Sequence, residues 1–307
     1  MRRYRSIVYD SDRWHGVRLR PGDIVISTPP KCGTTWTQMI CALLVFQTPA
    51  LPAGISELSP WVDQEVRSRT ALRSMLDAMD HRRFLKTHTP LDGLPRVDGV
   101  TYVCVGRDPR DVALSMDHHM ANLNLETFRL AREAAAAEDG IDLPPLITPP
   151  PRLDDPVERF WAWVDNETPV TESGSSLRRT LEHLATFSGA GDVDVVLVHY
   201  DELQRDLEGE MRRLAAHLGI EVPEDRWPSL VEAATFASMK ARASTTAPNA
   251  GKGFWRSDGA FFNRGTSGQW RAVMTTDADL VRYRSRVESI AGPDLASWAH
   301  RGWPPAL

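Results

Sequence analysis

Runs of consecutive apolar residues alternate along the chain with segments whose apolar residues recur at helical spacing. The run Ile24–Ile26 and the segments 83–87, 100–105 and 193–198 predict strands, and apolar runs are typical of strands covered on both faces. Helices are predicted at residues 36–46, 61–80, 157–165, 176–187, 207–218 and 277–290. The alternation predicts an α/β fold in which helices flank a central, mostly parallel sheet, with ligands at the carboxyl ends of its strands.

Two stretches interrupt this pattern, and neither separates one domain from another. Residues 121–156 pass from an alanine-rich acidic piece into a proline-dense one, which predicts either a surface loop or a lid over an acceptor site. Residues 240–270 are rich in Gly, Ser, Thr, Asn and Arg, so we expect a long loop there. No repeat or clear linker divides the chain, and we expect one domain over residues 1–307.

The composition narrows the classes of function. A net charge of −5 over 307 residues argues against a broad nucleic-acid surface, so an anion site must be a local pocket. The three cysteines have no metal-ligand spacing, and we expect no metal. The longest apolar run, within residues 39–46, is too short for a membrane span, and residues 1–16 lack the apolar core of a signal peptide. We therefore expect a cytoplasmic protein.

The first predicted strand leads into a loop that suits a tetrahedral anion. Gly33 allows the backbone to approach a ligand closely, and Thr34 and Thr35 add hydroxyl donors. The loop amides face outward at the N-terminus of the next helix, where partial positive charge gathers. Lys31 adds a full positive charge. The phosphate loop of NTPases has lysine after the glycine, whereas here lysine precedes it. The alternative interpretation is a polar turn with an incidental lysine.

The order P-K-C-G-T-T-W at residues 30–36 closely resembles the P-K-S-G-T-T-W loop of the cytosolic sulfotransferases. In that family the loop holds the 5′-phosphosulfate of the co-substrate 3′-phosphoadenosine 5′-phosphosulfate (PAPS). Cys32 replaces the family's serine, and a thiol is a weaker donor than a hydroxyl. The resemblance implies a P-loop-like strand–loop–helix that binds PAPS through Lys31, Cys32, Gly33, Thr34, Thr35 and, on the adenine side, Trp36.

A second segment, RDPRDVALS at residues 107–115, follows the third predicted strand. It resembles the family's R-[ND]-P-[KR]-D-x-x-x-S element, which implies that Arg107 and Ser115 bind the 3′-phosphate of PAPS. The resemblance further implies that Ser115 holds Lys31 back until an acceptor binds. The alternative is a helix capped by Asp108 and Asp111, with incidental charge.

Sulfonate transfer to an alcohol or phenol also requires a base, and K-T-H-T-P at residues 86–90 resembles the family's K-T-H-x-P. The resemblance implies that His88 is the general base and that Lys86 contacts the transferring sulfonate. A structural histidine at a strand end is the plain alternative. The neighbouring pair His118 and His119 reads as an exposed helix end.

Three later motifs are weaker. Residues 200–203, 234–240 and 261–270 resemble the family's Y-E-D-[LM], T-S-F-x-x-M-K and F-x-R-K-G-x-x-G-[DN]-W elements, although Ala234 and Asn263 depart from the pattern. The family's dimer motif is poorly matched at residues 271–280, which leaves the oligomeric state open. The further cofactor contacts that these motifs imply are Tyr200, Thr235, Phe236, Phe262, Asn263, Arg264 and Gly265.

The resemblance as a whole implies a sulfotransferase that moves a sulfonate from PAPS to an acceptor hydroxyl by in-line displacement. The acceptor would be a small phenolic or steroid-like molecule or a glycolipid. Lys31, Lys86 and the loop amides would stabilise the developing charge. Two alternatives are a P-loop-like nucleotide kinase, which would need Mg²⁺, and a non-catalytic nucleotide-binding protein.

Overall fold

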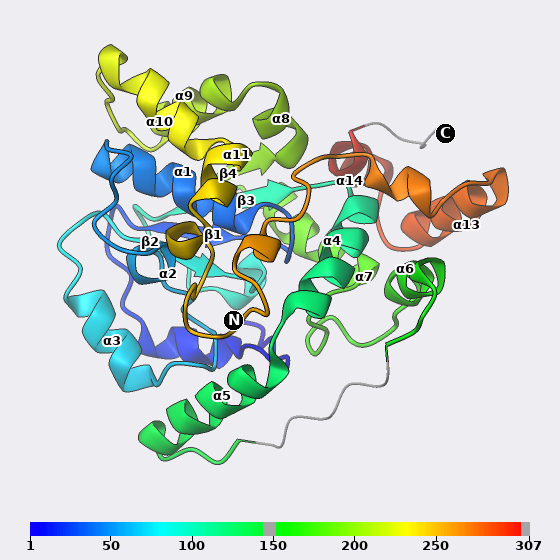
Figure 1. Cartoon of the computed structure of the whole chain (residues 1–307), viewed down its shortest axis with the longest axis horizontal. Helices are drawn as coiled ribbons and strands as arrows, with labels where there is room; N and C mark the ends of the chain where they lie inside the picture. Colours follow the sequence, from blue (N-terminus) through cyan, green and yellow to red (C-terminus); the bar gives the residue numbers. More distant parts are fainter. Residues whose placement is uncertain (144–151, 302–307) are drawn as a thin grey trace.

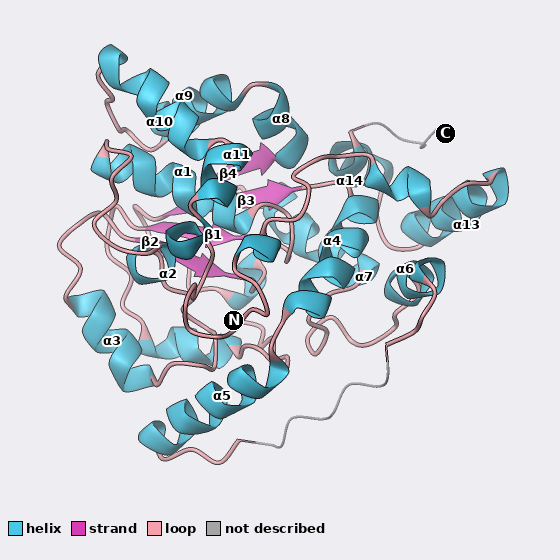
Figure 2. Cartoon of the chain, in the orientation of Figure 1, coloured by secondary structure: helices cyan, strands magenta, loops and turns pink. Residues whose placement is uncertain are grey.

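The computed structural model describes residues 1–143 and 152–301, and a parallel sheet lies at the centre of this part of the chain (Figures 1 and 2). Its strand order is β2-β1-β3-β4, and every neighbouring pair is parallel. All four predicted strands therefore form. Their bounds are Ile24–Ser27 (β1), Phe84–Thr87 (β2), Thr101–Gly106 (β3) and Asp194–His199 (β4).

Successive residues of β1 point to opposite faces of the sheet and join two different hydrophobic clusters. Ile24 and Ile26 pack in one cluster, which holds residues of α1 (Thr34–Phe46), α9 (Leu207–His217) and α10 (Trp227–Ala234). Val25 packs in the other, which holds residues of α7 (Leu177–Ser188) and α14 (Pro293–His300). The fold is thus a sheet between two helical layers, the architecture predicted from the sequence.

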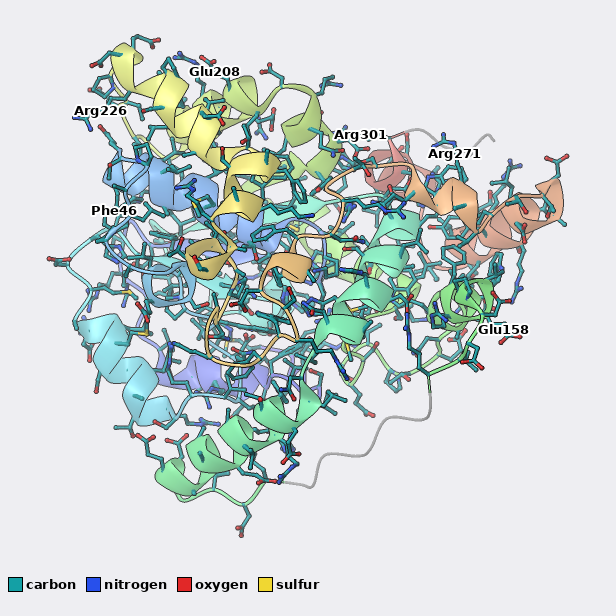
Figure 3. All side chains as sticks on the ribbon, viewed as in Figure 1. Phe46, Glu158, Glu208, Arg226, Arg271 and Arg301 are labelled. Atoms are coloured by element: carbon teal, nitrogen blue, oxygen red, sulfur yellow. The ribbon has the colours of Figure 1, made fainter. Side chains whose placement is uncertain are left out.

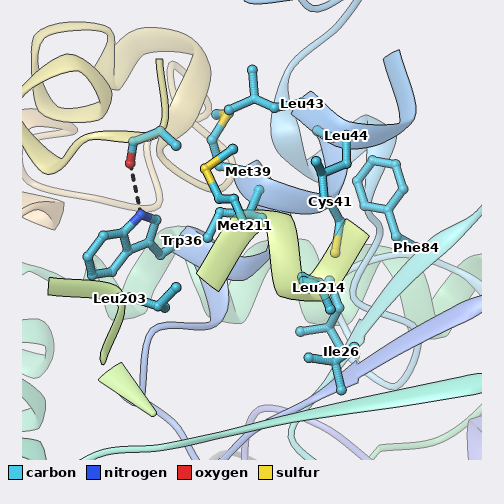
Figure 4. Packing of buried hydrophobic residues seen from close by; sticks show 14 of the residues in the cluster. Ile26, Trp36, Met39, Cys41, Leu43, Leu44, Phe84, Leu203, Met211 and Leu214 are labelled. Carbon is cyan, nitrogen blue, oxygen red and sulfur yellow. Dashed lines mark hydrogen bonds between the residues drawn. The ribbon is translucent and has the colours of Figure 1, made fainter. Parts of the chain in front are cut away.

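Helix α1 is the most deeply buried helix of the first layer. Trp36 and Met39 belong to the same cluster as Met211 and Leu214 of α9, and the Trp36 indole N–H donates a hydrogen bond of 2.8 Å to the carbonyl of Ala234 (Figure 4). This packing fixes the position of the α1 N-terminus, and with it the loop between β1 and α1. Charged side chains such as Glu158, Glu208 and Arg226 are exposed at the periphery (Figure 3).

The predicted helix over residues 61–80 is wrong in its first half. Only Arg69–Asp77 is helical (α3), whereas the segment from Trp61 runs beside β2 and forms a parallel bridge to Lys86. The reason is tertiary: Asp63 is fully buried and accepts hydrogen bonds from four side chains, which outweighs the helical pattern.

Residues 121–156 are also more regular than predicted. Helix α4 (Pro109–Asn122) is followed by a second helix, α5 (Leu125–Asp139), which accounts for the alanine-rich acidic piece. A surface loop or lid was the expectation for this stretch, and its proline-dense residues 144–151 lie outside the described residues.

The stretch 240–270 is mostly loop, as predicted, with short helical pieces within it. These are the end of α11 (Phe236–Ala241), α12 (Ala243–Thr246), η4 (Gly259–Phe261) and the start of η5 (Gln269–Ala272). No helix in the described ranges is long and apolar enough to cross a membrane. The remaining helices of the described chain are η1 (Ser11–Gly16), α2 (Ile55–Leu58), η2 (Leu91–Gly93), α6 (Pro156–Val164), α8 (Tyr200–Arg205), η3 (Glu224–Arg226) and α13 (Asp277–Glu288).

Candidate functional site

A cavity of about 740 Å³ lies at the carboxyl ends of the strands. Lys31 follows β1, His88 follows β2 and Arg107 follows β3, and all three line this cavity together with Lys86 at the end of β2. The sequence prediction that the three motif segments share one edge of the sheet is therefore confirmed. The parallel register of the strands brings the segments together.

The loop after β1 has the backbone that an anion cradle requires. Gly33 has a φ of 100° and Lys31 a φ of 70°, both in the left-handed region. A Cβ on Gly33 would lie 3.0 Å from Cδ2 of Tyr200, so a side chain here would displace that ring. Helix α1 begins at Thr34, and its partly positive N-terminus faces the loop.

The ammonium of Lys31 is enclosed among aromatic rings and other cations. Its Nζ lies 3.2 Å from Nδ1 of His119 and 4.9 Å from the centre of the Phe261 ring. Burial, with the nearby charges of Arg107 and Lys86, lowers the pKa of Lys31 to about 7. The hydrogen-bond partner of this lysine in the structure is His119, and the role expected of Ser115, which lines the same cavity, stays a prediction.

His119 corrects a second expectation, because it does not lie at an exposed helix end. It stands in the last turn of α4, lines the cavity and packs against the rings of Trp255 (4.9 Å between centroids) and Phe261 (5.9 Å). Burial, then the charge of Lys31, lowers the pKa of His119 well below its ordinary value, so its ring is neutral near pH 7. One signal existed in the sequence: position 119 is one helical turn after Ser115.

Arg107 links the anion loop to the stretch 240–270. Its guanidinium donates to the carbonyls of Lys31 (3.0 Å) and Thr266 (3.2 Å) and lies over the Tyr200 ring at 4.2 Å. Its Nε is buried and has no hydrogen-bond partner. Arg107 therefore places a guanidinium between the anion loop and this stretch, at the edge of the cavity.

His88 has a defined tautomer. Its Nδ1 lies 2.7 Å from the carbonyl oxygen of Thr28, and because a carbonyl can only accept, Nδ1 carries the proton. The free lone pair is therefore on Nε2. Burial, then the charge of Lys86, lowers the pKa of His88 well below its ordinary value, which keeps the ring neutral at pH 7. The ring of Trp61 lies edge-on to it at 4.7 Å.

Lys86 packs against a group of residues that the sequence analysis did not predict. Its Nζ lies 4.2 Å from the centre of the Trp61 ring, whose N–H donates to Asp63 at 2.6 Å. The same carboxylate accepts from the hydroxyls of Thr87 (2.6 Å) and Thr89 (2.5 Å), on either side of His88. Burial lowers the pKa of Lys86 to about 8, and the charge of Asp63 opposes this shift. Trp61 and Asp63 thus position both Lys86 and His88.

Most of the other residues predicted to contact the cofactor face the same cavity. Two do not line it: Cys32 is fully buried, and Thr235 caps α11 by accepting a hydrogen bond of 3.2 Å from the Ser238 amide. Their cofactor roles, like those of the other residues, stay predictions. Those that line the cavity are Gly33, Thr34, Thr35, Trp36, Ser115, Tyr200, Phe236, Phe262, Asn263, Arg264 and Gly265.

Asp111 fixes the end of the stretch 240–270 through hydrogen bonds. This carboxylate accepts the amide hydrogens of Gly268 (2.6 Å) and Trp270 (3.1 Å), while Asp108 alone caps α4. In the alternative interpretation of this segment Asp111 helped to cap the helix, whereas its partners lie about 160 residues further along the chain. Within the described ranges, no three His, Cys, Asp or Glu side chains gather as a metal site would require.

Comparisons with known proteins agree with this geometry. A family model described as a sulfotransferase domain matches residues 21–283. The glycolipid sulfotransferase of Mycobacterium bovis (strain BCG / Pasteur 1173P2) is 43% identical over 320 residues, covering 99% of this chain and 96% of that protein. A solved structure of mouse sulfotransferase SULT7A1 complexed with PAP is similar in fold, with a TM-score of 0.67, 18% identity and coverage of 95% and 93%. Retinol dehydratase in a complex with retinol and PAP has a TM-score of 0.67, 20% identity and coverage of 92% and 86%.

Proposed function

This chain belongs to the sulfotransferase family, and we propose that it transfers a sulfonate group from PAPS to a hydroxyl of a glycolipid. Two findings support the substrates. The mycobacterial relative, which this chain matches over almost its whole length, is named for a glycolipid acceptor. Two proteins of similar fold were solved with PAP. PAP is 3′-phosphoadenosine 5′-phosphate, the nucleotide that remains when PAPS loses its sulfonate.

The donor end of the cavity suits a molecule with an anionic group at each end. The loop amides, Lys31 and the α1 N-terminus would hold the 5′-phosphosulfate, and the guanidinium of Arg107, which lines the cavity, would pair with the 3′-phosphate. The aromatic side chains of Tyr200 and Phe236 line the same end and would flank the purine.

The observation that carries the mechanism is the 2.7 Å contact between His88 Nδ1 and the Thr28 carbonyl. It leaves the basic lone pair on Nε2, which takes the proton of the acceptor hydroxyl as its oxygen forms a bond to sulfur. The bond between sulfur and the bridging phosphate oxygen breaks at the same time, and Lys31 donates a hydrogen bond to that departing oxygen. Lys86 stabilises the charge on the sulfonate oxygens.

The acceptor end of the cavity favours an amphiphile over a small phenol. Met116, Met120, Phe128 and Phe254 contribute an apolar wall. Ser6, Asn166, Thr168 and Ser175 contribute polar groups that can bind a sugar. Helix α5 supplies part of this wall through Phe128 and would help enclose the acceptor. We also propose that the enzyme is cytoplasmic, as expected from its sequence. Fractionation of cells that produce it would test this location.

Three measurements test the proposal together. PAP should raise the melting temperature of the protein, whereas ATP with Mg²⁺ should not, which separates a sulfotransferase from a kinase. Transfer of labelled sulfonate from PAPS to a glucosyl or galactosyl lipid should be faster than transfer to a simple phenol. His88→Ala should abolish turnover and leave PAP binding nearly intact. A His88→Ala enzyme with the wild-type rate would rule out the base, and a preference for phenols would rule out the acceptor class.

A further inference from the structure

Arg67 is a cation that lines the cavity and has no role in the proposed mechanism. In the proposed mechanism Lys31, Lys86 and Arg107 contact the donor and the transferred group. Arg67 lines the same cavity, as does Phe128 of the proposed acceptor wall on α5. Helix α5 is adjacent to the segment that carries Arg67, since Arg132 pairs with Glu65 at 2.8 Å and Asp139 accepts from the Arg69 amide at 2.9 Å.

The guanidinium of Arg67 has no carboxylate partner within 4.0 Å among the described residues. Its one side-chain hydrogen bond runs from Nη1 to the thioether sulfur of Met75 at 2.8 Å, and a thioether is a weak acceptor. None of its nitrogens is among the fully buried atoms that lack a partner, so the free donors reach open space. The residue also lines the cavity, so these donors are available to a ligand bound there.

The acids near Arg67 are already engaged with other groups. Glu65 is paired with Arg132, Asp12 with Arg69 at 3.2 Å, and Asp63 with its four donors. Glu57 remains, but it acts on Arg67 only from a distance and lies 3.8 Å from Lys252. Arg67 therefore keeps most of its charge uncompensated.

The charges that line the cavity also favour an anionic ligand. The described lining residues include the cations Lys31, Lys86, Arg107, Lys252, Arg264 and Arg67, against the single acid Glu172. Glu172 is exposed, so its charge is screened by solvent. Burial lowers the pKa of Arg67, which means that its ion has lost part of its hydration. An incoming oxyanion would replace that lost hydration.

We infer that Arg67 forms an anion subsite in the acceptor end, which selects acceptors carrying a carboxylate or phosphate group away from the hydroxyl that is sulfonated. This inference rests on the proposed function and narrows its acceptor class to acidic glycolipids. The planar fork of a guanidinium matches both oxyanions with two parallel hydrogen bonds. The apolar side chains of Phe128 and Phe254 in the same cavity would hold the lipid part.

Calorimetric titration of the PAP-saturated enzyme tests the subsite without relying on turnover. The probes are octyl β-D-glucoside, octyl β-D-glucuronide and octyl β-D-glucoside 6-phosphate, which share one chain and differ in charge. Arg67→Gln removes the charge and keeps hydrogen-bonding groups, and Arg67→Lys keeps the charge without the fork. Arg73→Gln is the matched control, since it removes one charge from an exposed position on α3 outside the cavity lining.

Wild-type enzyme should bind at least one charged glycoside at least about tenfold more tightly than the neutral one, the lower range for a charge-assisted hydrogen bond. Arg67→Gln should abolish that preference, Arg67→Lys should keep part of it, and Arg73→Gln should leave it unchanged. Equal binding of all three glycosides by the wild type, or an unchanged preference in Arg67→Gln, would overturn the subsite alone. Failure to bind PAP in the first step would instead overturn the proposed function.

Discussion

The ammonium of Lys31 lies 3.2 Å from Nδ1 of His119, so the lysine proposed to assist the leaving group rests on a neutral imidazole from the acceptor side of the cavity. The low pKa of His119 keeps its ring neutral, and because an ammonium can only donate, Nδ1 is the acceptor when Lys31 is charged. The hydrogen bond favours the charged form of the lysine and opposes the burial that lowers its pKa.

Replacing His119 should therefore change the titration of Lys31. His119→Phe keeps an aromatic ring but removes the acceptor, so the pKa of Lys31 should fall by about one unit, the equivalent of one hydrogen bond to a charged group. The pH at which kcat/KM declines on the alkaline side should fall by the same amount. His119→Asn, which offers an acceptor oxygen at a similar place, should restore most of it. A decline at an unchanged pH in both variants would contradict the link.

The pH dependence of the wild type follows from the lysines and His88. His88 has a pKa well below 6.5, so its base form persists and kcat/KM should hold below that pH. Lys31 and Lys86 have pKa values of about 7 and about 8, and each loses its useful charge as pH rises through that value. The rate should therefore decline between pH 7 and 8. Lys31→Arg stays charged, and its decline should begin nearer pH 8. An identical profile would exclude Lys31 as the titrating group.

Arg107 should discriminate between nucleotides with and without a 3′-phosphate. Arg107→Ala should weaken PAP binding by roughly 1.5–3 kcal/mol more than it weakens adenosine 5′-monophosphate binding, the range for a hydrogen bond to a charged group. Calorimetry with both ligands measures the difference. Arg205→Ala, at a position whose side chain is 76% exposed, is the control for charge alone. An undiminished preference for PAP in Arg107→Ala would refute the assignment.

Asp63 should matter to stability and catalysis together. In Asp63→Asn one oxygen becomes an amide nitrogen that cannot accept. Trp61 donates to Oδ1, and the other three donors share Oδ2, so at least one buried donor loses its acceptor. We expect a loss of about 3 kcal/mol in the free energy of unfolding, measured with denaturant. Asp92→Asn, at a partly exposed carboxylate that accepts from Tyr4, should cost less than half as much. Equal losses of unfolding free energy in the two variants would contradict a larger contribution of Asp63 to stability.

Asp111 should control how tightly the stretch 240–270 closes. Asp111→Ala removes the acceptor for the amides of Gly268 and Trp270 and leaves the rest of the cavity in place. We expect PAP to dissociate faster and to bind about tenfold more weakly, the effect of one lost charge-assisted hydrogen bond. Asp111→Asn keeps one acceptor oxygen and should be intermediate. Stopped-flow displacement of PAP provides the rates, and wild-type rates in both variants would argue against this role.

The sequence revealed what is local and periodic. All four strands and most of the longer helices follow from apolar runs and spacing, and the motif segments meet where the strand ends predict. The site residues it missed depend on contacts between distant parts of the chain. Lys31 and His119 are 88 positions apart, and Asp63 is 24 positions from Thr87. Helix α5 was hidden because alanine-rich acidic sequence lacks a strong apolar stripe, although Phe128 and Ala135 are buried.

The donor and acceptor ends form one continuous cavity, with His88 among the residues that line it. A single molecule that joins a nucleotide bisphosphate to an alkyl glycoside could therefore occupy both ends without crossing a protein wall. Once its nucleotide part is bound, the glycoside would be present at a high effective concentration, and its affinity would exceed that of either half by orders of magnitude. The continuity of the cavity thus makes the enzyme a target for two-headed inhibitors, with His88 indicating where the linker must pass.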